Sequence, residues 1–202
     1  MTKIKFCGLS RPCDIEAANE LGPEYIGFVF SANSRRYVSP DKAAMLKRML
    51  SAHIQAVGVF VDEPVGMIAK LLRNRIIDIA QLHGSEDNEY IKQLRKLNDK
   101  PIVKAFRIKT AGDIANAEQC IADFVLLDSG AGTGTVFNWE LIQNIKRPYF
   151  LAGGLSPDNV ADSITMLHPF VVDVSSGIET DGAKDKLKMA AFVAAVRKED
   201  RT

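Results

Sequence analysis

The chain lacks an excess of positive or of negative charge. Among its 202 residues, 26 Lys and Arg stand against 25 Asp and Glu, so the formal net charge is +1. Such a balance gives no overall field that would attract nucleic acid or an anionic membrane, and any anion site must be local. We therefore expect a small-molecule ligand and neither a nucleic-acid nor a membrane partner.

Cysteine is scarce as well. The three cysteines, Cys7, Cys13 and Cys120, are odd in number and lack the Cys-x-x-Cys spacing of zinc and dithiol sites. This pattern indicates reduced thiols in a cytoplasmic protein. The His, Asp and Glu residues also show no metal-ligand spacing, so we expect no metal site.

Long hydrophobic runs are absent. No stretch approaches the roughly 18 to 20 apolar residues that a membrane span requires. The chain enters Lys3-Ile4-Lys5-Phe6 without the apolar core of a signal peptide. We therefore expect a cytoplasmic, unprocessed protein.

Short apolar segments, in contrast, recur along the chain. With 47% hydrophobic residues and no linker-like composition, residues 1–202 are expected to form one domain. The segments are mostly continuous runs of Val, Ile, Leu and Phe, which is typical of strands covered on both faces. The predicted strands are residues 3–7, 25–30, 55–60, 78–82, 102–106, 124–128, 149–152 and 171–175.

A helix signal follows each predicted strand. Several of these signals contain a proline, whose missing N–H costs little in the first turn of a helix. In chain order, the expected helix starts are Pro12, Ser39-Pro40, Glu63-Pro64, the residue after Asp87, Thr110, Asn138, Ser156-Pro157 and about Ala183, with the last helix running to about Arg197.

This alternation predicts an α/β protein with a (β/α)8 TIM barrel. Eight strand–helix units of about 25 residues fit the lower size limit of about 200 residues for this fold. A doubly wound sheet is the alternative, but it needs no eighth strand and usually carries a G-x-G-x-x-G turn after the first strand. Residues 7–12 read CGLSRP instead. In a barrel, the C-terminal ends of all strands share one rim, where active sites are built.

Glycine-rich turns lie at two places on this predicted rim. Gly153 and Gly154 follow the seventh strand, and Ser175, Ser176 and Gly177 follow the eighth. These are the loops that bind phosphate in many barrels, because glycine lets backbone N–H groups approach an anion. Either turn alone would be explained by a change of chain direction. The two together predict a phosphate site.

Cys7 ends the first predicted strand and Asp128 the sixth. Two interpretations fit Cys7. It is either a small apolar core residue or, with a lowered pKa, a general base or nucleophile. Two interpretations also fit Asp128. It either braces the glycine-rich loop at 130–134, which we interpret as a lid or a substrate-shaping loop, or is a general acid kept protonated by burial. Cys13 and Cys120 lie on predicted helices and are expected in the core.

Cations and histidines near the rim are the remaining candidates. Arg35 and Arg36 follow the second strand, where paired arginines are often a solvated surface but one can bind a carboxylate in bidentate fashion. His83 ends the fourth strand and is a candidate ligand contact. His53 and His168 have no such rim position and are expected to be structural.

A run of short motifs spans nearly the whole chain. The segments are KFCGLS at 5–10, GFVF at 27–30, SRRYVSP at 34–40, VGVF at 57–60, QLHG at 81–84, LLDS at 126–129, GTG at 132–134 with FNW at 137–139, LAGGL at 151–155 and DVSSGIE at 173–179. Together and in this order they resemble the phosphoribosylanthranilate isomerase family of tryptophan biosynthesis. Two positions depart from the family pattern, which often has Lys or Gln where Thr135 stands and Asp where Asn138 stands.

The resemblance implies a cofactor-free, single-domain barrel that is a monomer or homodimer. It implies Cys7 as general base, Asp128 as general acid, Arg36 as the contact for the anthranilate carboxylate, and the two glycine-rich turns as phosphate binders. The implied reaction is the Amadori rearrangement of N-(5-phosphoribosyl)anthranilate to 1-(2-carboxyphenylamino)-1-deoxyribulose 5-phosphate, the third step from chorismate. Its acid must keep a proton near neutral pH, well above the usual aspartate pKa of about 3.9. A thiolate suits its base if the iminium of the substrate or a helix dipole lowers the usual cysteine pKa of about 8.5.

Three other functions are alternatives for a barrel of this kind. A related barrel isomerase of histidine biosynthesis would need a carboxylate in place of Cys7. Indole-glycerol-phosphate synthase would need a catalytic lysine at a strand end, whereas Lys5 and Lys104 lie inside strands. A phosphate-binding barrel without catalysis is disfavoured because both Cys7 and Asp128 are retained.

Overall fold

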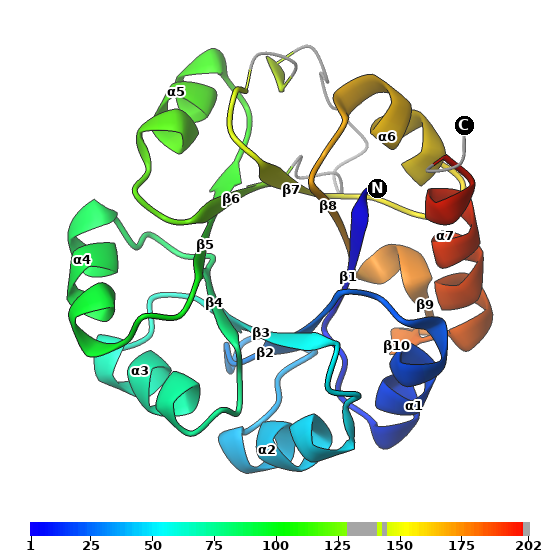
Figure 1. Ribbon diagram of the computed structural model, residues 1–202, viewed down its shortest axis with the longest axis horizontal. Coiled ribbons are helices and arrows are strands. Elements are labelled where there is room, and N and C mark those ends of the chain that lie inside the picture. The colour runs from blue at the N-terminus through cyan, green and yellow to red at the C-terminus, as the bar shows by residue number, and fades with distance from the viewer. Residues whose placement is uncertain (129–140, 143–144, 200–202) are drawn as a thin grey trace.

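Eight parallel strands form a ring that is surrounded by helices (Figure 1). The computed structural model describes residues 1–128, 141–142 and 145–199. Every strand pairs in parallel with its neighbour in sequence, and β1 pairs with β8, so the sheet closes on itself. This confirms the predicted barrel and excludes the doubly wound sheet.

The strands match the predicted segments closely. Four have the predicted bounds, and the other four differ by one residue at one end. They are β1 (Lys3–Cys7), β2 (Tyr25–Val29), β3 (Gln55–Phe60), β4 (Ile79–Leu82), β5 (Ile102–Arg107), β6 (Phe124–Asp128), β7 (Tyr149–Ala152) and β8 (Val171–Val174). The agreement is close because a strand covered on both faces is a continuous apolar run that ends where polar residues begin.

Two of the helices, α2 (Pro40–Met49) and α4 (Asn88–Leu97), begin at an N-cap side chain that accepts a hydrogen bond from a backbone N–H of the first turn. Ser39 accepts a hydrogen bond from the Lys42 N–H, and Asp87 accepts one from the Tyr90 N–H. The helices are α1 (Pro12–Leu21), α2 (Pro40–Met49), α3 (Val65–Arg73), α4 (Asn88–Leu97), α5 (Ala111–Gln119), α6 (Val160–Leu167) and α7 (Lys186–Glu199). The helix expected near Asn138 and the lid expected at 130–134 lie outside the described residues.

Two helix starts were predicted too early. The seventh predicted helix begins at Val160, because the Asn159 side chain accepts from the Ser156 N–H and donates to the Gly154 carbonyl, which closes a separate turn first. The last helix begins at Lys186, because the preceding residues form a two-stranded antiparallel hairpin. The strands of this hairpin are β9 (Glu179–Thr180) and β10 (Ala183–Lys184).

The interior of the barrel is apolar at its N-terminal end. There the Phe150 ring lies 5.6 Å from Tyr25, 5.8 Å from Phe124 and 6.5 Å from Phe170, between ring centroids. The Lys3 ammonium covers the Phe170 ring at 4.6 Å. A second and larger apolar cluster fills the space between the strands and the helices. Filling one end of the barrel in this way leaves the C-terminal end for a site.

Two glycines provide a test of this packing. A Cβ at Gly58 would lie 2.7 Å from Ile77 Cδ1 and 2.8 Å from Phe60 Cε2, whereas a Cβ at Gly66 in α3 would meet nothing within 4 Å. We expect Gly58→Ala to lower the free energy of unfolding by about 1 to 3 kcal/mol through overpacking. Gly66→Ala is expected to raise it by about 0.4 to 1 kcal/mol. Urea denaturation measures both, and changes of the same sign would contradict the packing described.

Candidate active site

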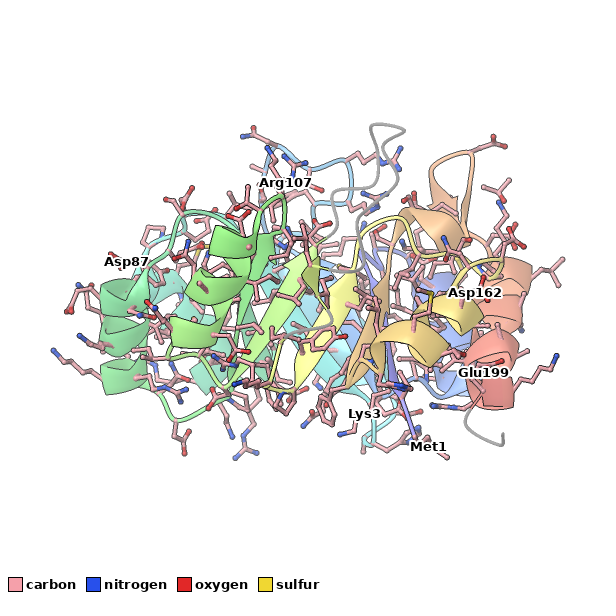
Figure 2. The ribbon with its side chains drawn as sticks, turned by 90° about the horizontal axis from the view of Figure 1, so that it is seen from above. Met1, Lys3, Asp87, Arg107, Asp162 and Glu199 are labelled. Carbon is pink, nitrogen blue, oxygen red and sulfur yellow. The ribbon has the colours of Figure 1, made fainter. Side chains whose placement is uncertain are left out.

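A cavity of about 300 Å³ opens at the C-terminal end of the barrel. In the side view this is the end that carries Arg107, opposite the end that carries Lys3 (Figure 2). The lining residues come from seven of the eight strands or the turns that follow them, and they are Cys7, Val59, Gln81, His83, Arg107, Asp128, Ala152, Gly153, Gly154, Leu155, Asp173, Ser175 and Ser176. The predicted Cys7, Asp128, His83 and both glycine-rich turns are thus brought together.

Cys7 is half-buried at the end of β1, among charged groups. Burial raises the pKa of its thiol above the usual value. The positive charges of Lys5 and Lys184 act in the opposite direction, and the negative charge of Asp173 adds to the effect of burial. The protein groups around Cys7 thus do not lower the pKa of its thiol, because loss of hydration outweighs the nearby cations.

Asp128 lies at the end of β6, next to a histidine and an amide. His83 Nε2 is 3.6 Å from Asp128 Oδ2, and His83 Nδ1 is 3.0 Å from the Gln81 side-chain nitrogen Nε2. An amide nitrogen is a donor, so Nδ1 accepts and the proton of the neutral ring is on Nε2. Gln81 thus turns an N–H of His83 toward Asp128. A second hollow, of about 310 Å³, is lined by His83, Arg107 and Asp128 among others.

The two glycine-rich turns are pressed against each other. Gly153 and Gly154 both have positive φ, at 97° and 65°, a region that favours glycine. A Cβ at Gly177 would lie 1.9 Å from the Leu155 carbonyl oxygen, so only glycine lets the turns approach this closely. The Ser175 hydroxyl also donates to the Cys7 carbonyl at 3.1 Å. The β8 turn is therefore tied to both the β7 turn and the candidate base.

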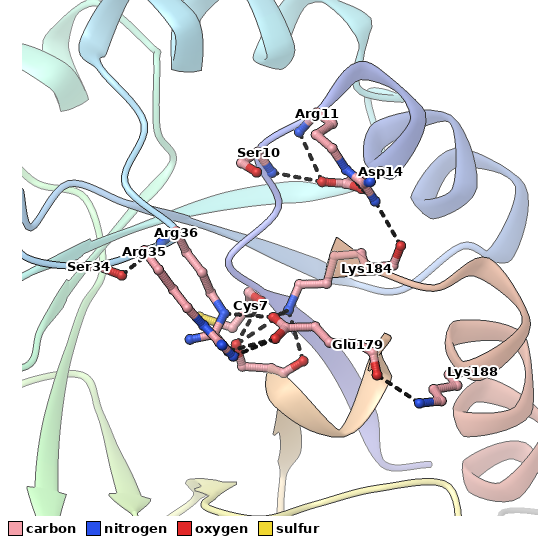
Figure 3. Close-up of polar contacts among 11 residues, drawn as sticks. Cys7, Ser10, Arg11, Asp14, Ser34, Arg35, Arg36, Glu179, Lys184 and Lys188 are labelled. Atoms are coloured by element: carbon pink, nitrogen blue, oxygen red, sulfur yellow. Dashed lines mark hydrogen bonds and ion pairs between the residues drawn. The ribbon is translucent and has the colours of Figure 1, made fainter. Parts of the chain in front are cut away.

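Arg36 lies beside this site but is already paired within the protein. Its Nε and one Nη donate to the two oxygens of Glu179 at 2.6 and 2.8 Å, and Arg35 donates to the same carboxylate at 2.8 Å (Figure 3). The Arg36 side chain is 21% exposed and that of Arg35 is 61% exposed. Arg36 is not among the residues that line the cavity, although its Cδ packs so closely on Gly8 that a Cβ there would lie 2.4 Å away.

Lys184, on the hairpin strand β10, completes this charged cluster. Its ammonium donates to Glu179 at 2.7 Å and to the Ser175 carbonyl at 2.8 Å. Burial alone would raise the pKa of Glu179, but hydrogen bonds from Arg36 and Lys184 and their charges lower it to about 2. Glu179 therefore links the loop after β2 to the turn after β8.

Sequence reasoning assigned no role to several residues of this site. Gln81 and Asp173 each stand two positions before a predicted rim residue, and side chains two apart in a strand share a face, so the alternation could have found them. The hairpin had a signal in Asp181-Gly182, both with positive φ, which is the preferred pair for a two-residue hairpin turn. No local signal marked Arg107.

The other predictions for cysteine and histidine have a mixed outcome. Cys120 is buried as expected, but Cys13 is exposed on α1 and the expectation of a core position is wrong. His53 and His168 lie away from the cavity, and His168 ends α6 with a φ of 45°. Among the described residues, no group of three or more metal-ligating side chains is placed to hold a metal ion.

Comparison with known proteins gives a consistent result. The family model described as N-(5'-phosphoribosyl)anthranilate isomerase matches residues 4–195. The chain is 41% identical to the isomerase of that name from Endomicrobium trichonymphae, over 98% of this chain and 99% of that protein. It is 42% identical to the one from Clostridium acetobutylicum, over 98% and 99% respectively.

Solved structures agree with the sequence comparisons. The phosphoribosylanthranilate isomerase of Thermotoga maritima is 32% identical to this chain, with a TM-score of 0.89 over 98% of this chain and 100% of that one. A structure of such an isomerase in complex with reduced 1-(o-carboxyphenylamino)-1-deoxyribulose 5-phosphate has a TM-score of 0.86 at 31% identity, with the same coverage. Within the described part of the chain, each helix is too short or too polar to cross a membrane.

The low pKa of Glu179 predicts how stability depends on pH. Its value of about 2 in the folded protein lies below the usual glutamate value of about 4.3, so its contribution is present above about pH 4.3 and is lost as the pH falls toward 2. We expect Glu179→Gln to lower the free energy of unfolding most near neutral pH, with the gap to the parent protein narrowing between pH 4.3 and 2. Urea denaturation across this range measures the gap.

A matched control is Glu89→Gln, which removes an exposed carboxylate 3.3 Å from Lys92. Exposed pairs of this kind contribute little, so a small effect is expected at every pH. A gap for Glu179→Gln that stays constant from pH 7 to 2 would contradict the role given to this carboxylate.

Proposed function

The chain belongs to the N-(5'-phosphoribosyl)anthranilate isomerase family of tryptophan biosynthesis, and we propose that its reaction is carried by Asp128 as general acid and Cys7 as general base. The observation that carries this proposal is that both side chains line one cavity at the catalytic end of the barrel. A thiol and a carboxyl on opposite sides of a bound sugar can exchange protons with two of its atoms.

The chemistry assigns one proton transfer to each residue. Asp128 gives a proton to the ring oxygen of the ribose, the C1–O bond breaks, and the nitrogen lone pair forms a C1=N iminium. Cys7 then takes the C2 proton, the electrons of that C–H bond form the C1=C2 bond of an enolamine, and the π electrons of the C1=N bond return to the nitrogen. Tautomerisation of the enolamine gives the ketose product. No redox partner is needed, because the oxidation of C2 balances the reduction of C1.

His83 and Gln81 are proposed to support the acid. The His83 Nε2–H faces Asp128 and Gln81 holds the ring in that tautomer, which orients the carboxyl group. The oxygen of the Gln81 side-chain amide, Oε1, has no hydrogen-bond partner among the described residues, and neither has Asp173 Oδ1. Both residues line the cavity, so we propose that these two buried oxygens accept hydrogen bonds from the ribose hydroxyls of the substrate.

The phosphate of the substrate is assigned to the turns after β7 and β8. Gly153, Gly154, Ser175 and Ser176 line the cavity and Gly177 lets the turns meet, so their backbone N–H groups can converge on one anion. A phosphate held away from the reacting carbons supplies binding energy that orients the sugar between Asp128 and Cys7.

The anthranilate carboxylate is assigned to Arg36. Glu179 occupies Nε and one Nη of this guanidinium, which leaves its other terminal nitrogen to donate to the substrate. Glu179 therefore fixes the plane of the guanidinium. Arg35 shares the same carboxylate but is far more exposed, and we assign it no contact with the substrate.

Substitution of the two proton-transfer residues tests the mechanism. Cys7→Ala and Asp128→Asn are each expected to lower kcat by about 10² to 10⁴, the usual cost of removing a general acid or base, with the fold retained. Loss of the fluorescence of the anthranilate adduct measures turnover. Cys13→Ala, at the exposed cysteine of α1, is the control and should turn over normally. A Cys7→Ala or Asp128→Asn enzyme with near-normal kcat would refute the role given to that residue.

Gly177→Ala tests the phosphate site. Because the new Cβ would meet the Leu155 carbonyl, the two turns must separate, and we expect the inhibition constant of inorganic phosphate to rise tenfold or more. The control is Gly112→Ala in α5, where the nearest atom would be the Thr110 hydroxyl at 3.5 Å. Circular dichroism checks that both variants fold. Unchanged inhibition by phosphate in a folded Gly177→Ala protein would place the phosphate elsewhere.

A further inference from the structure

A buried cation lies directly beneath the candidate base. Lys5 stands two residues before Cys7 in β1, so both side chains point into the barrel. The Lys5 side chain is 0% exposed, and its ammonium is 2.7 Å from Asp173 Oδ2 on β8. The other Asp173 oxygen, Oδ1, has no hydrogen-bond partner among the described residues.

The Lys5 ammonium and the Cys7 sulfur meet over the same point of β2. A Cβ at Gly27 would lie 3.0 Å from Cys7 Sγ and 3.4 Å from Lys5 Nζ. Any larger residue would therefore displace one group or the other. Gly27 leaves room for the two to interact above the strand.

Stability alone does not account for this ion pair. When a lysine and an aspartate are buried, both lose their hydration, which costs free energy. Replacement of such a pair by well-packed apolar residues often leaves stability unchanged or raises it. The same chain fills the lower part of the barrel with apolar and aromatic side chains. A charge pair placed next to the sulfur therefore calls for a role in the chemistry at the sulfur.

Four charged groups act on the Cys7 sulfur or face it. They are Lys5 on the same strand, Asp173 on β8, Lys184 on β10 and Arg36 in the loop after β2. Arg36 and Lys184 are each bonded to Glu179 at the rim, whereas Lys5 is bonded to Asp173 on the cavity floor. Of these cations, Lys5 favours the thiolate most strongly.

We propose that Lys5 is a positioning residue whose ammonium is the counter-ion of the Cys7 thiolate, with Asp173 holding it in place. The proposal rests on the function proposed above, in which Cys7 is the base. When the thiolate takes the C2 proton its charge disappears, and Lys5 remains neutralised by Asp173. The same ammonium is therefore paired with Asp173 when the sulfur is a thiol, and it faces both Asp173 and the sulfur when the sulfur is a thiolate.

The electrostatics around the sulfur agree with this assignment. Lys5 lowers the pKa of Cys7 against the larger effect of burial, and Cys7 in turn raises the pKa of Lys5, together with the stronger effect of Asp173. Such coupling is reciprocal by thermodynamic necessity. Loss of the Lys5 charge should therefore raise the pKa of the Cys7 thiol directly.

Alkylation of Cys7 by iodoacetamide tests the proposal without substrate. The rate follows the thiolate fraction, and a Cys13→Ala, Cys120→Ala background makes Cys7 the reacting thiol. At fixed pH below the thiol pKa, we expect Lys5→Met to slow alkylation at least tenfold and Lys5→Arg to restore most of the rate. Asp173→Asn should act in the opposite direction, because its amide oxygen still accepts a hydrogen bond from Lys5 while the negative charge that opposes the thiolate is removed.

The matched control is Lys104→Met. Lys104 is also a buried strand lysine, 3.0 Å from Glu86, but it lies on the outer side of β5 and does not line the cavity. Equal slowing by Lys5→Met and Lys104→Met would overturn the proposal, as would slower alkylation in Asp173→Asn. If Lys5→Met does not fold, the alkylation rate of Asp173→Asn still decides between the two outcomes.

The two proposals fail in different experiments. Alkylation reports on the sulfur alone, whereas the kcat of Cys7→Ala reports on its role as base. In the active parent background, Lys5→Met should also move the acidic limb of the kcat/KM profile to higher pH. A normal kcat in Cys7→Ala would refute the role of Cys7 as general base. An unaltered alkylation rate in Lys5→Met would refute the role of Lys5 as counter-ion.

Discussion

Strand β1 pairs with strand β8 from Lys3 to Phe6, and this contact between the two ends of the chain closes the barrel. The register sets Lys5 directly beside Asp173, so the ion pair under the cavity exists only in the closed ring. One layer above, the Ser175 hydroxyl donates to the Cys7 carbonyl. Closure therefore places the candidate base, its cation and the phosphate turn within one set of contacts.

Each of the cations Lys5, Arg36 and Lys184 is in contact with a carboxylate of the protein. Lys5 has Asp173 as its partner, while Arg36 and Lys184 share Glu179. Each cation is thus held in one orientation before a ligand arrives, which is the arrangement that favours electrostatic catalysis. Compensation also explains why burial dominates the pKa of Cys7, since each nearby positive charge is already opposed by a carboxylate.

The outcome of prediction differed between local and distant features. Strand bounds were found to within one residue, because a run covered on both faces shows itself in composition alone. Helix starts with a capping side chain, such as Ser39 and Asp87, were found for the same local reason. The hairpin around Asp181 and Gly182 was missed although its turn signal was present, because the segment was assigned to the helix that follows.

The sequence by itself determined the barrel, its rim and many of the residues that stand there, although not Arg107. Those features depend on neighbours along the chain. Only the tertiary structure decided that Arg36 meets Glu179, 143 residues away, and that Lys5 meets Asp173, 168 residues away. It also decided the direction of the Cys7 pKa. Hydration and Coulomb energy depend on distance in space, and closure of the ring alone brings these groups within reach of one another.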